Sequence, residues 1–168
     1  MVKIRPEQPG DVAAIDVVNR AAFNQPNEAT LVVLLREQAS PLVSLVAETD
    51  GELVGHVLFS PVTLTGHADA TIMGLAPMAV VPAMQRRGIG SLLIRAGLDA
   101  CARLGCVAVV VLGHAQYYPR FGFRPASAFG LRSEYDVPDE VFMALELVPG
   151  RLTGTSGTIR YHAAFARV

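Results

Sequence analysis

The feature that most constrains the fold is a strand, a glycine-containing turn, a long helix and a second strand, in that order. Residues 70–81 read as a long strand interrupted by Pro77, residues 88–104 repeat apolar side chains at helical spacing, and residues 106–112 are continuously apolar. A continuously apolar strand is typical of a parallel sheet covered on both faces. Two strands joined in this way form a right-handed crossover. We therefore predict an α/β fold.

The flanking segments predict antiparallel strands and covering helices. Asp50-Gly51 is a pair typical of tight hairpins, and it separates two β-rich runs at residues 42–48 and 53–64. Asp11 is a candidate helix cap. The remaining elements are expected at residues 2–5 (strand), 12–23 and 28–38 (helices), 117–121 (one helical turn), 141–148 (strand) and 153–168 (last strand and tail).

Length and composition restrict the class of protein. The 168 residues suit a single domain over 1–168, and 51% hydrophobic residues exclude an intrinsically disordered chain. The 14 basic and 15 acidic residues lack the basic excess of a protein that binds nucleic acid or anionic membranes. No apolar run is long enough to span a bilayer, and no secretory signal follows Met1, so we expect a cytoplasmic protein. The apolar composition also permits a homodimer.

The cysteines and most histidines indicate no reactive or metal centre. Cys101 and Cys106 have neither disulfide-framework nor zinc-knuckle spacing, and we interpret them as buried thiols. His56, His67 and His162 are each isolated in the sequence, so no metal site is expected.

The turn at residues 85–91, Gln-Arg-Arg-Gly-Ile-Gly-Ser, carries the chemistry. Glycines at a helix start allow close approach to the backbone, and the first amides of a helix attract anions. Leu93 occupies the third glycine position of a dinucleotide-binding fingerprint, and no Walker lysine follows. The turn therefore predicts a different phosphate cradle, although the same glycines could serve only a tight strand-to-helix turn.

Two motifs together resemble a known family. Gln85, Gly88 and Gly90 are in the marked positions of the Q/R-x-x-G-x-G/A signature of the GNAT superfamily of acyl-CoA-dependent N-acetyltransferases. The whole pattern most resembles bacterial acetyltransferases of unassigned substrate. Residues 78–82 resemble the end of that family's central strand. Residues 117–123, Tyr-Tyr-Pro-Arg-Phe-Gly-Phe, are similar to its aromatic element after the next strand.

The resemblance implies how acetyl-CoA is bound. It implies a mixed central sheet, flanked by helices, that splays apart between its fourth and fifth strands. Pro77 is a local reason for such a gap, because proline removes a ladder donor. The pantetheine arm would pair with the backbone of Met78, Ala79 and Val80. The pyrophosphate would meet the turn, for which the candidate binding residues are Gln85, Arg86, Arg87, Gly88, Ile89, Gly90 and Ser91.

The resemblance also implies catalytic roles. Val80 N–H is the candidate oxyanion donor and Tyr118 the candidate general acid, with Tyr117 taking that role if the motif is shifted by one residue. Glu28 is the candidate base, although a glutamate there is also an ordinary first-turn helix charge. His114 could be a proton relay or a hydrogen-bonded turn histidine.

The implied function is transfer of an acetyl group from acetyl-CoA to a primary amine of a small molecule or peptide, by direct attack in a ternary complex. The alternative is a non-catalytic acyl-CoA-binding sensor or interaction module. We expect the acceptor pocket to be built by the first two helices, the turn at 64–70 and the carboxyl-terminal segment.

Overall fold

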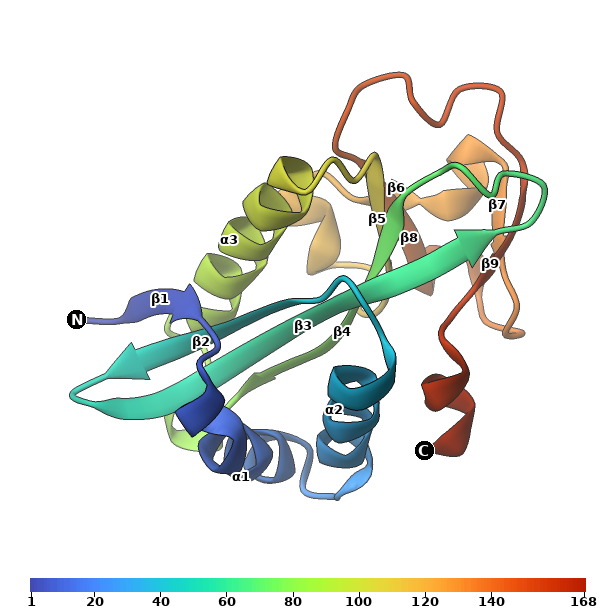
Figure 1. The fold of residues 1–168 in the computed structure, drawn as a ribbon. Helices are drawn as coiled ribbons and strands as arrows, with labels where there is room; N and C mark the ends of the chain where they lie inside the picture. The colour runs from blue at the N-terminus through green and yellow to red at the C-terminus, as the bar shows by residue number, and fades with distance from the viewer.

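The computed structural model describes all residues 1–168 and consists of one sheet with three α-helices around it (Figure 1). Strands β1 to β5, β8 and β6 lie in the order β1-β2-β3-β4-β5-β8-β6, and β9 pairs with both β3 and β7. The strands are β1 (Lys3–Pro6), β2 (Val43–Thr49), β3 (Glu52–Leu64), β4 (Ile72–Val80), β5 (Ala108–Leu112), β6 (Arg124–Pro125), β7 (Leu131–Ser133), β8 (Phe142–Glu146) and β9 (Gly157–Arg160). The α-helices are α1 (Val12–Phe23), α2 (Asn27–Gln38) and α3 (Ile89–Arg103). Six 3₁₀ turns complete the chain: η1 (Pro9–Asp11), η2 (Pro82–Met84), η3 (Tyr118–Phe121), η4 (Ala126–Phe129), η5 (Asp139–Val141) and η6 (Ala163–Arg167).

The predicted α/β fold with a mixed sheet is confirmed, and the strand-helix-strand unit is present as β4, α3 and β5. Sequence analysis did not find β6 and β7, because strands of two or three residues are too short to show periodicity. Asp11 occupies the N-cap position of α1, as predicted, but its side chain makes no capping hydrogen bond there. Its carboxylate instead accepts a hydrogen bond from the Gln8 amide at 2.7 Å and pairs with Arg5.

The β2-β3 hairpin forms at the predicted Asp-Gly pair. Asp50 and Gly51 both have positive φ, +52° and +80°, which suits the tight turns that match the twist of paired strands. Thr49 pairs with Glu52 directly across the turn. This hairpin places β3 between β2 and β4. One edge of β3 therefore pairs with β2 and the other with β4.

The helices cover opposite faces of the sheet. α3 packs on one face, with Leu93 and Ile94 against Phe59 and Val57 in the largest hydrophobic cluster. α1 and α2 pack on the other face, where Ile15 and Leu35 share a cluster with β2 and β3 residues (Figure 1). Because side chains alternate across a strand, β3 contributes to both cores. The core therefore holds β3 and its neighbour β4 firmly in place.

The sheet opens between β4 and β5. These parallel strands pair only over Ile72–Gly74 and Ala108–Val110, and β4 continues as far as Val80 without this neighbour. On its other side β4 stays paired with β3, with a register shift opposite the segment that contains Pro77. The predicted splay is therefore confirmed, and it leaves one edge of β4 uncovered over half its length.

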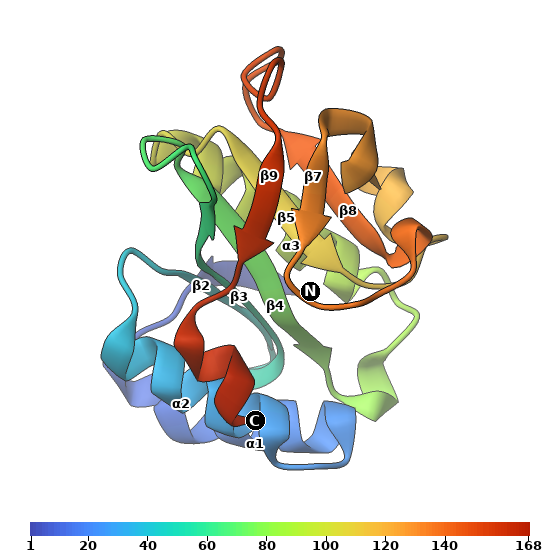
Figure 2. The ribbon, with the colours of Figure 1, turned by 90° about the vertical axis from the view of Figure 1, so that its right-hand side faces the viewer.

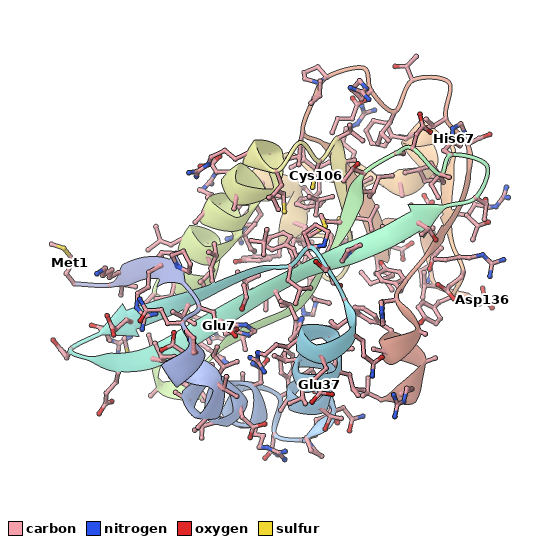
Figure 3. The ribbon with its side chains drawn as sticks, in the orientation of Figure 1. Met1, Glu7, Glu37, His67, Cys106 and Asp136 are labelled. Atoms are coloured by element: carbon pink, nitrogen blue, oxygen red, sulfur yellow. The ribbon has the colours of Figure 1, made fainter.

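The carboxyl-terminal segment returns to the first helices. β9 pairs with the end of β3 and with β7, and η6 then packs against α2 (Figure 2). By contrast His67, in the loop after β3, lies at the opposite end of the molecule from α1 and α2 (Figure 3). No helix is long and apolar enough to cross a bilayer.

Candidate active site

A cavity of about 1030 Å³ lies where β4 and β5 separate. Most residues expected to bind or react line it: Glu28, Met78, Val80, Gln85, Arg86, Gly88, Ile89, Gly90, Ser91 and Tyr118. Ala79 and Arg87 are not among its lining residues. The fold therefore brings a glutamate from α2, a strand edge, a helix start and a tyrosine to one space.

The uncovered edge of β4 presents backbone groups to the cavity. Val81 N–H donates to Val54 O on β3 at 2.9 Å. Because successive strand residues point to opposite edges, Val80 and Met78 direct their amides away from β3 and toward the gap. Ala79 pairs with His56 of β3, so its backbone N–H and C=O groups point toward β3 and away from the gap. Gln85 Nε2 donates to Val80 O at 2.9 Å and so ties the following turn to the end of the strand.

The start of α3 presents a run of unpaired amides. Arg86 and Gly88 have left-handed backbone conformations, with φ of +64° and +82°, which turn the chain tightly between η2 and α3. None of the amides of residues 86–91 donates a backbone hydrogen bond, and the first helical bond is Leu92 N–H to Gly88 O at 3.1 Å. Amides at a helix start carry a partial positive charge. This turn can therefore bind an anion such as a diphosphate.

Tyr117 and Tyr118 approach the cavity from η3. Tyr118 is only 7% exposed, and burial raises its pKa to about 12. Its ring lies against Gly113, where an added Cβ would be 2.3 Å from the ring carbon Cε2. The hydroxyl of Tyr117 instead approaches Gly90 at the start of α3, 3.0 Å from an ideal Cβ there. The two phenols therefore have different surroundings, and only Tyr118 is buried.

The cavity contains titratable side chains besides the two tyrosines of the aromatic motif. Gln25 Nε2 donates to both carboxylate oxygens of Glu28, at 3.0 and 3.1 Å, and orients this group at the start of α2. His114 lines the cavity just after β5. Sequence analysis did not single out Arg120, which also lines the cavity and places its guanidinium 5.4 Å from the Tyr117 ring centroid. Arg120 lies inside the aromatic motif at residues 117–123, and this position is the sequence signal from which it could have been identified.

The acceptor side of the cavity is built partly as expected. The junction of α1 and α2 and the carboxyl-terminal segment both contribute, through Phe23, Leu31, Tyr135, Tyr161 and Phe165. The turn at 64–70 contributes no lining residue, contrary to our expectation. It lies elsewhere because β9 pairs with Thr63 and Leu64 and occupies the space beside the end of β3.

The cysteines lie outside this site. Cys101 and Cys106 are buried between α3 and the sheet, and Cys106 is labelled there in Figure 3. Burial raises the pKa of Cys101 to about 12 and also raises that of Cys106. Both therefore remain thiols at neutral pH, and a thiol is a weak nucleophile.

A splayed α/β sheet, with unpaired amides at a helix start and a tyrosine in the gap, is the arrangement expected of an acyl-CoA-dependent acetyltransferase. The sequence matches the acetyltransferase (GNAT) family over residues 12–123. The chain therefore belongs to this family, and it is an acetyl-CoA-dependent N-acetyltransferase.

Two curated relatives are similar over most of the chain. The uncharacterized N-acetyltransferase YjhQ of Escherichia coli K12 is 42% identical over an alignment of 153 residues that covers 86% of this chain and 84% of YjhQ. The uncharacterized N-acetyltransferase YhbS of the same strain is 38% identical over 165 residues, 98% of each chain.

Solved structures agree with this family. The crystal structure of YhbS from Escherichia coli in complex with CoA gives a TM-score of 0.93 at 37% identity, covering 99% of this chain and 92% of that one. A GNAT family acetyltransferase from Brucella melitensis in complex with acetyl-CoA gives 0.81 at 37% identity, covering 98% of both chains.

Proposed function

We propose that this enzyme transfers the acetyl group of acetyl-CoA directly to a primary amine while both substrates are bound. The observation that carries the proposal is the single cavity that joins the unpaired amides of residues 86–91, the free edge of β4 and Tyr118. Crystal structures of similar proteins with CoA and acetyl-CoA support acetyl-CoA as the substrate bound here. Direct attack is favoured because the two cysteines are buried away from the cavity.

The coenzyme would lie along β4 and end at α3. Its pyrophosphate would accept hydrogen bonds from the amides of residues 86–91, with Arg86 and Arg120 adding positive charge. The pantetheine amides would pair with the gap-facing backbone of Met78, as an added strand does, and Val80 N–H would remain free for the acetyl oxygen. Gln85 would act indirectly, because its side-chain amide is already donated to Val80 O.

The chemistry uses three groups on the cavity wall. Glu28 would take one proton from the substrate ammonium, and the amine nitrogen would then attack the thioester carbonyl. Val80 N–H would donate to the oxyanion that forms. As the carbon–sulfur bond breaks, Tyr118 would give its proton to the departing sulfur and regain one from the attacking nitrogen. The products are an acetamide and CoA thiol, and the proton on Glu28 leaves to solvent.

A pair of matched glycine variants tests the cradle. Gly88 and Gly66 have nearly equal φ, +82° and +79°, and a Cβ at either position meets nothing within 4 Å. Gly88→Glu and Gly66→Glu therefore carry the same backbone strain, but only Gly88 lies in the cavity. We expect Gly88→Glu to weaken acetyl-CoA binding at least about 100-fold by charge and bulk, while Gly66→Glu binds as the parent does.

Calorimetric titration with acetyl-CoA measures this difference, and thiol release with an amine panel measures turnover. Equal affinity of the parent and Gly88→Glu would remove the cradle from the proposal. Tight binding of acetyl-CoA with no thiol release on any amine would favour the sensor function instead.

A further inference from the structure

We infer, building on the proposed function, that the acceptor is a primary amine carried on an aromatic or aliphatic body with no carboxylate or phosphate near the nitrogen. The part of the cavity that would hold this body is called the acceptor end. It is lined by Phe23, Glu28, Leu31, Tyr135, Tyr161 and Phe165.

Aromatic rings from the carboxyl-terminal segment form one wall of the acceptor end. The Tyr161 ring centroid lies 5.7 Å from that of Tyr135 and 5.1 Å from that of Phe165, so the three rings form a continuous row. The Tyr161 ring also packs over Gly74, the last β4 residue paired with β5, where an added Cβ would be 3.1 Å from the ring. This row therefore begins where the gap in the sheet begins.

The facing wall comes from the first two helices. Phe23 ends α1, and Leu31 lies one turn into α2. The two walls meet because η6 packs against α2 (Figure 2). Apolar and aromatic walls of this kind favour a ring or an alkyl chain, since burial of apolar surface and contact between rings both stabilise it.

The charges in the cavity are segregated. Glu28 is the only carboxylate among the lining residues, and it lies at the acceptor end. The arginines that line the cavity, Arg86 and Arg120, come from the turn before α3 and from η3, so they belong to the coenzyme side. The acceptor end can therefore pair with an ammonium group but has no cation for a carboxylate.

An α-amino acid is thus a poor acceptor. Its amine would reach Glu28, but its carboxylate would lie nearby without a partner, and a buried unpaired charge is unfavourable. Repulsion between that carboxylate and Glu28 acts in the same direction. A polyamine is also disfavoured, because its further ammonium groups would lie against apolar walls, and no second carboxylate lines the cavity.

The closing experiment compares 2-phenylethylamine with phenylalanine, which differ only in the α-carboxylate. We expect kcat/KM for 2-phenylethylamine to exceed that for phenylalanine by at least about 100-fold, because only phenylalanine buries an unpaired charge. Hexylamine tests the aliphatic body, and spermidine and a lysine-containing peptide complete the panel. Equal use of phenylalanine, or spermidine or the peptide as the best substrate, would overturn the inference.

Variants in the aromatic row provide the structural control. Tyr161→Ala should raise KM for 2-phenylethylamine about tenfold by removing the wall, whereas Val17→Ala, on the exposed side of α1 and outside the cavity, should leave it unchanged. Phe165→Ala is a second such variant if Tyr161→Ala does not fold. Each variant should bind acetyl-CoA with the affinity of the parent.

The outcomes also separate this inference from the proposed function. Acetylation of the peptide or of spermidine, without 2-phenylethylamine or hexylamine, would refute the acceptor class but leave the acetyl transfer to amines intact. Failure to bind acetyl-CoA would refute the proposed function itself. No acetylation of any amine in the panel, with acetyl-CoA bound, would count against both.

Discussion

Tyr117 and Tyr118 show how two adjacent residues of one type acquire different properties. Tyr118 is buried with its ring against Gly113 and Phe123, and burial raises its pKa to about 12. Its phenol therefore stays protonated throughout the neutral and mildly alkaline range. Tyr117 is partly exposed and packs on Phe121 and under Arg120. A proton donor must hold its proton until the sulfur leaves, which suits Tyr118.

Tyr118→Phe should lower kcat about 100-fold, the usual loss when a positioned proton donor is removed, while acetyl-CoA binding changes little. Tyr117→Phe is the matched control, and it should keep most of kcat. Steady-state kinetics across pH 6 to 9 measures both. If Tyr117→Phe has the larger effect, the motif register is shifted by one residue and the two roles exchange.

At the scale of elements, α3 and β3 approach each other closely, and this contact positions α3, which begins directly after the turn at residues 85–88. Gly97 of α3 lies against the buried Phe59 of β3, and a Cβ at Gly97 would be 2.1 Å from ring carbon Cε1 and 2.5 Å from Cζ. At this one position of the helix, no side chain fits unless the Phe59 ring moves. The glycine is therefore required by packing, because its φ is not left-handed.

Gly97→Ala should destabilise the fold by about 1 to 3 kcal/mol through overpacking, despite the better helix propensity of alanine. Leu92→Ala is the control on the same helix, because Leu92 is 47% exposed and its truncation should cost less than about 1 kcal/mol. Urea unfolding measures both free energies. Equal stability of Gly97→Ala and the parent would mean that α3 moves away from the sheet freely.

At the scale of the molecule, one buried polar chain connects both early helices to the sheet. Asn19 Nδ2 of α1 donates to His56 Nδ1 of β3 at 3.1 Å, so His56 presents its Nε2–H to Ser44 Oγ of β2 at 2.9 Å. Ser44 donates to Glu7 at 2.6 Å, and Arg36 of α2 donates to the same carboxylate at 2.9 and 3.2 Å. His56 is fully buried. Because Nδ1 accepts from Asn19, His56 is neutral in this chain, and Asn19 Oδ1 is left without a partner.

This arrangement makes the fold sensitive to acid. Burial lowers the pKa of His56 from 6.5 to about 4, so between these values the unfolded state binds more protons than the folded state. The stability that neutral His56 contributes is therefore complete above pH 6.5 and is lost as the pH falls toward 4. Hydrogen bonds from Arg36 and Ser44 keep the pKa of Glu7 below its usual value despite its burial, so Glu7 adds a further loss at lower pH.

The parent should lose about 2 kcal/mol between pH 7.5 and pH 5, equivalent to a fall in Tm of about 4 to 8 °C. His56→Gln keeps a donor and an acceptor in the ring positions but cannot titrate, so its Tm should depend less on pH in this range. His67→Gln, in the loop after β3, should follow the parent. Scanning calorimetry measures all three, and identical pH slopes for the parent and His56→Gln would exclude His56 as the cause.

The fold class and the part of the cavity formed by β4 and the start of α3 were predictable because their signals are local. The α3 repeat, the two glycines of the turn and the apolar β5 run are each set by neighbouring residues, and local spacing determines which backbone amides are left unpaired. Met78 and Val80 could be named as site residues, but only the register with β3 decides that they face the gap and that Ala79 does not.

The acceptor side was decided by tertiary structure alone. Tyr135 and Tyr161 come from separate late segments. They line the same cavity as Glu28 because β9 pairs with β3 and β7, and η6 then packs on α2. The buried role of His56 likewise depends on Asn19, Ser44 and Glu7, which are distant in the sequence. Short strands that pair over long distances leave no periodic pattern in the sequence. They are stabilised by burial against residues that lie far away in the chain, so neighbouring residues do not reveal them.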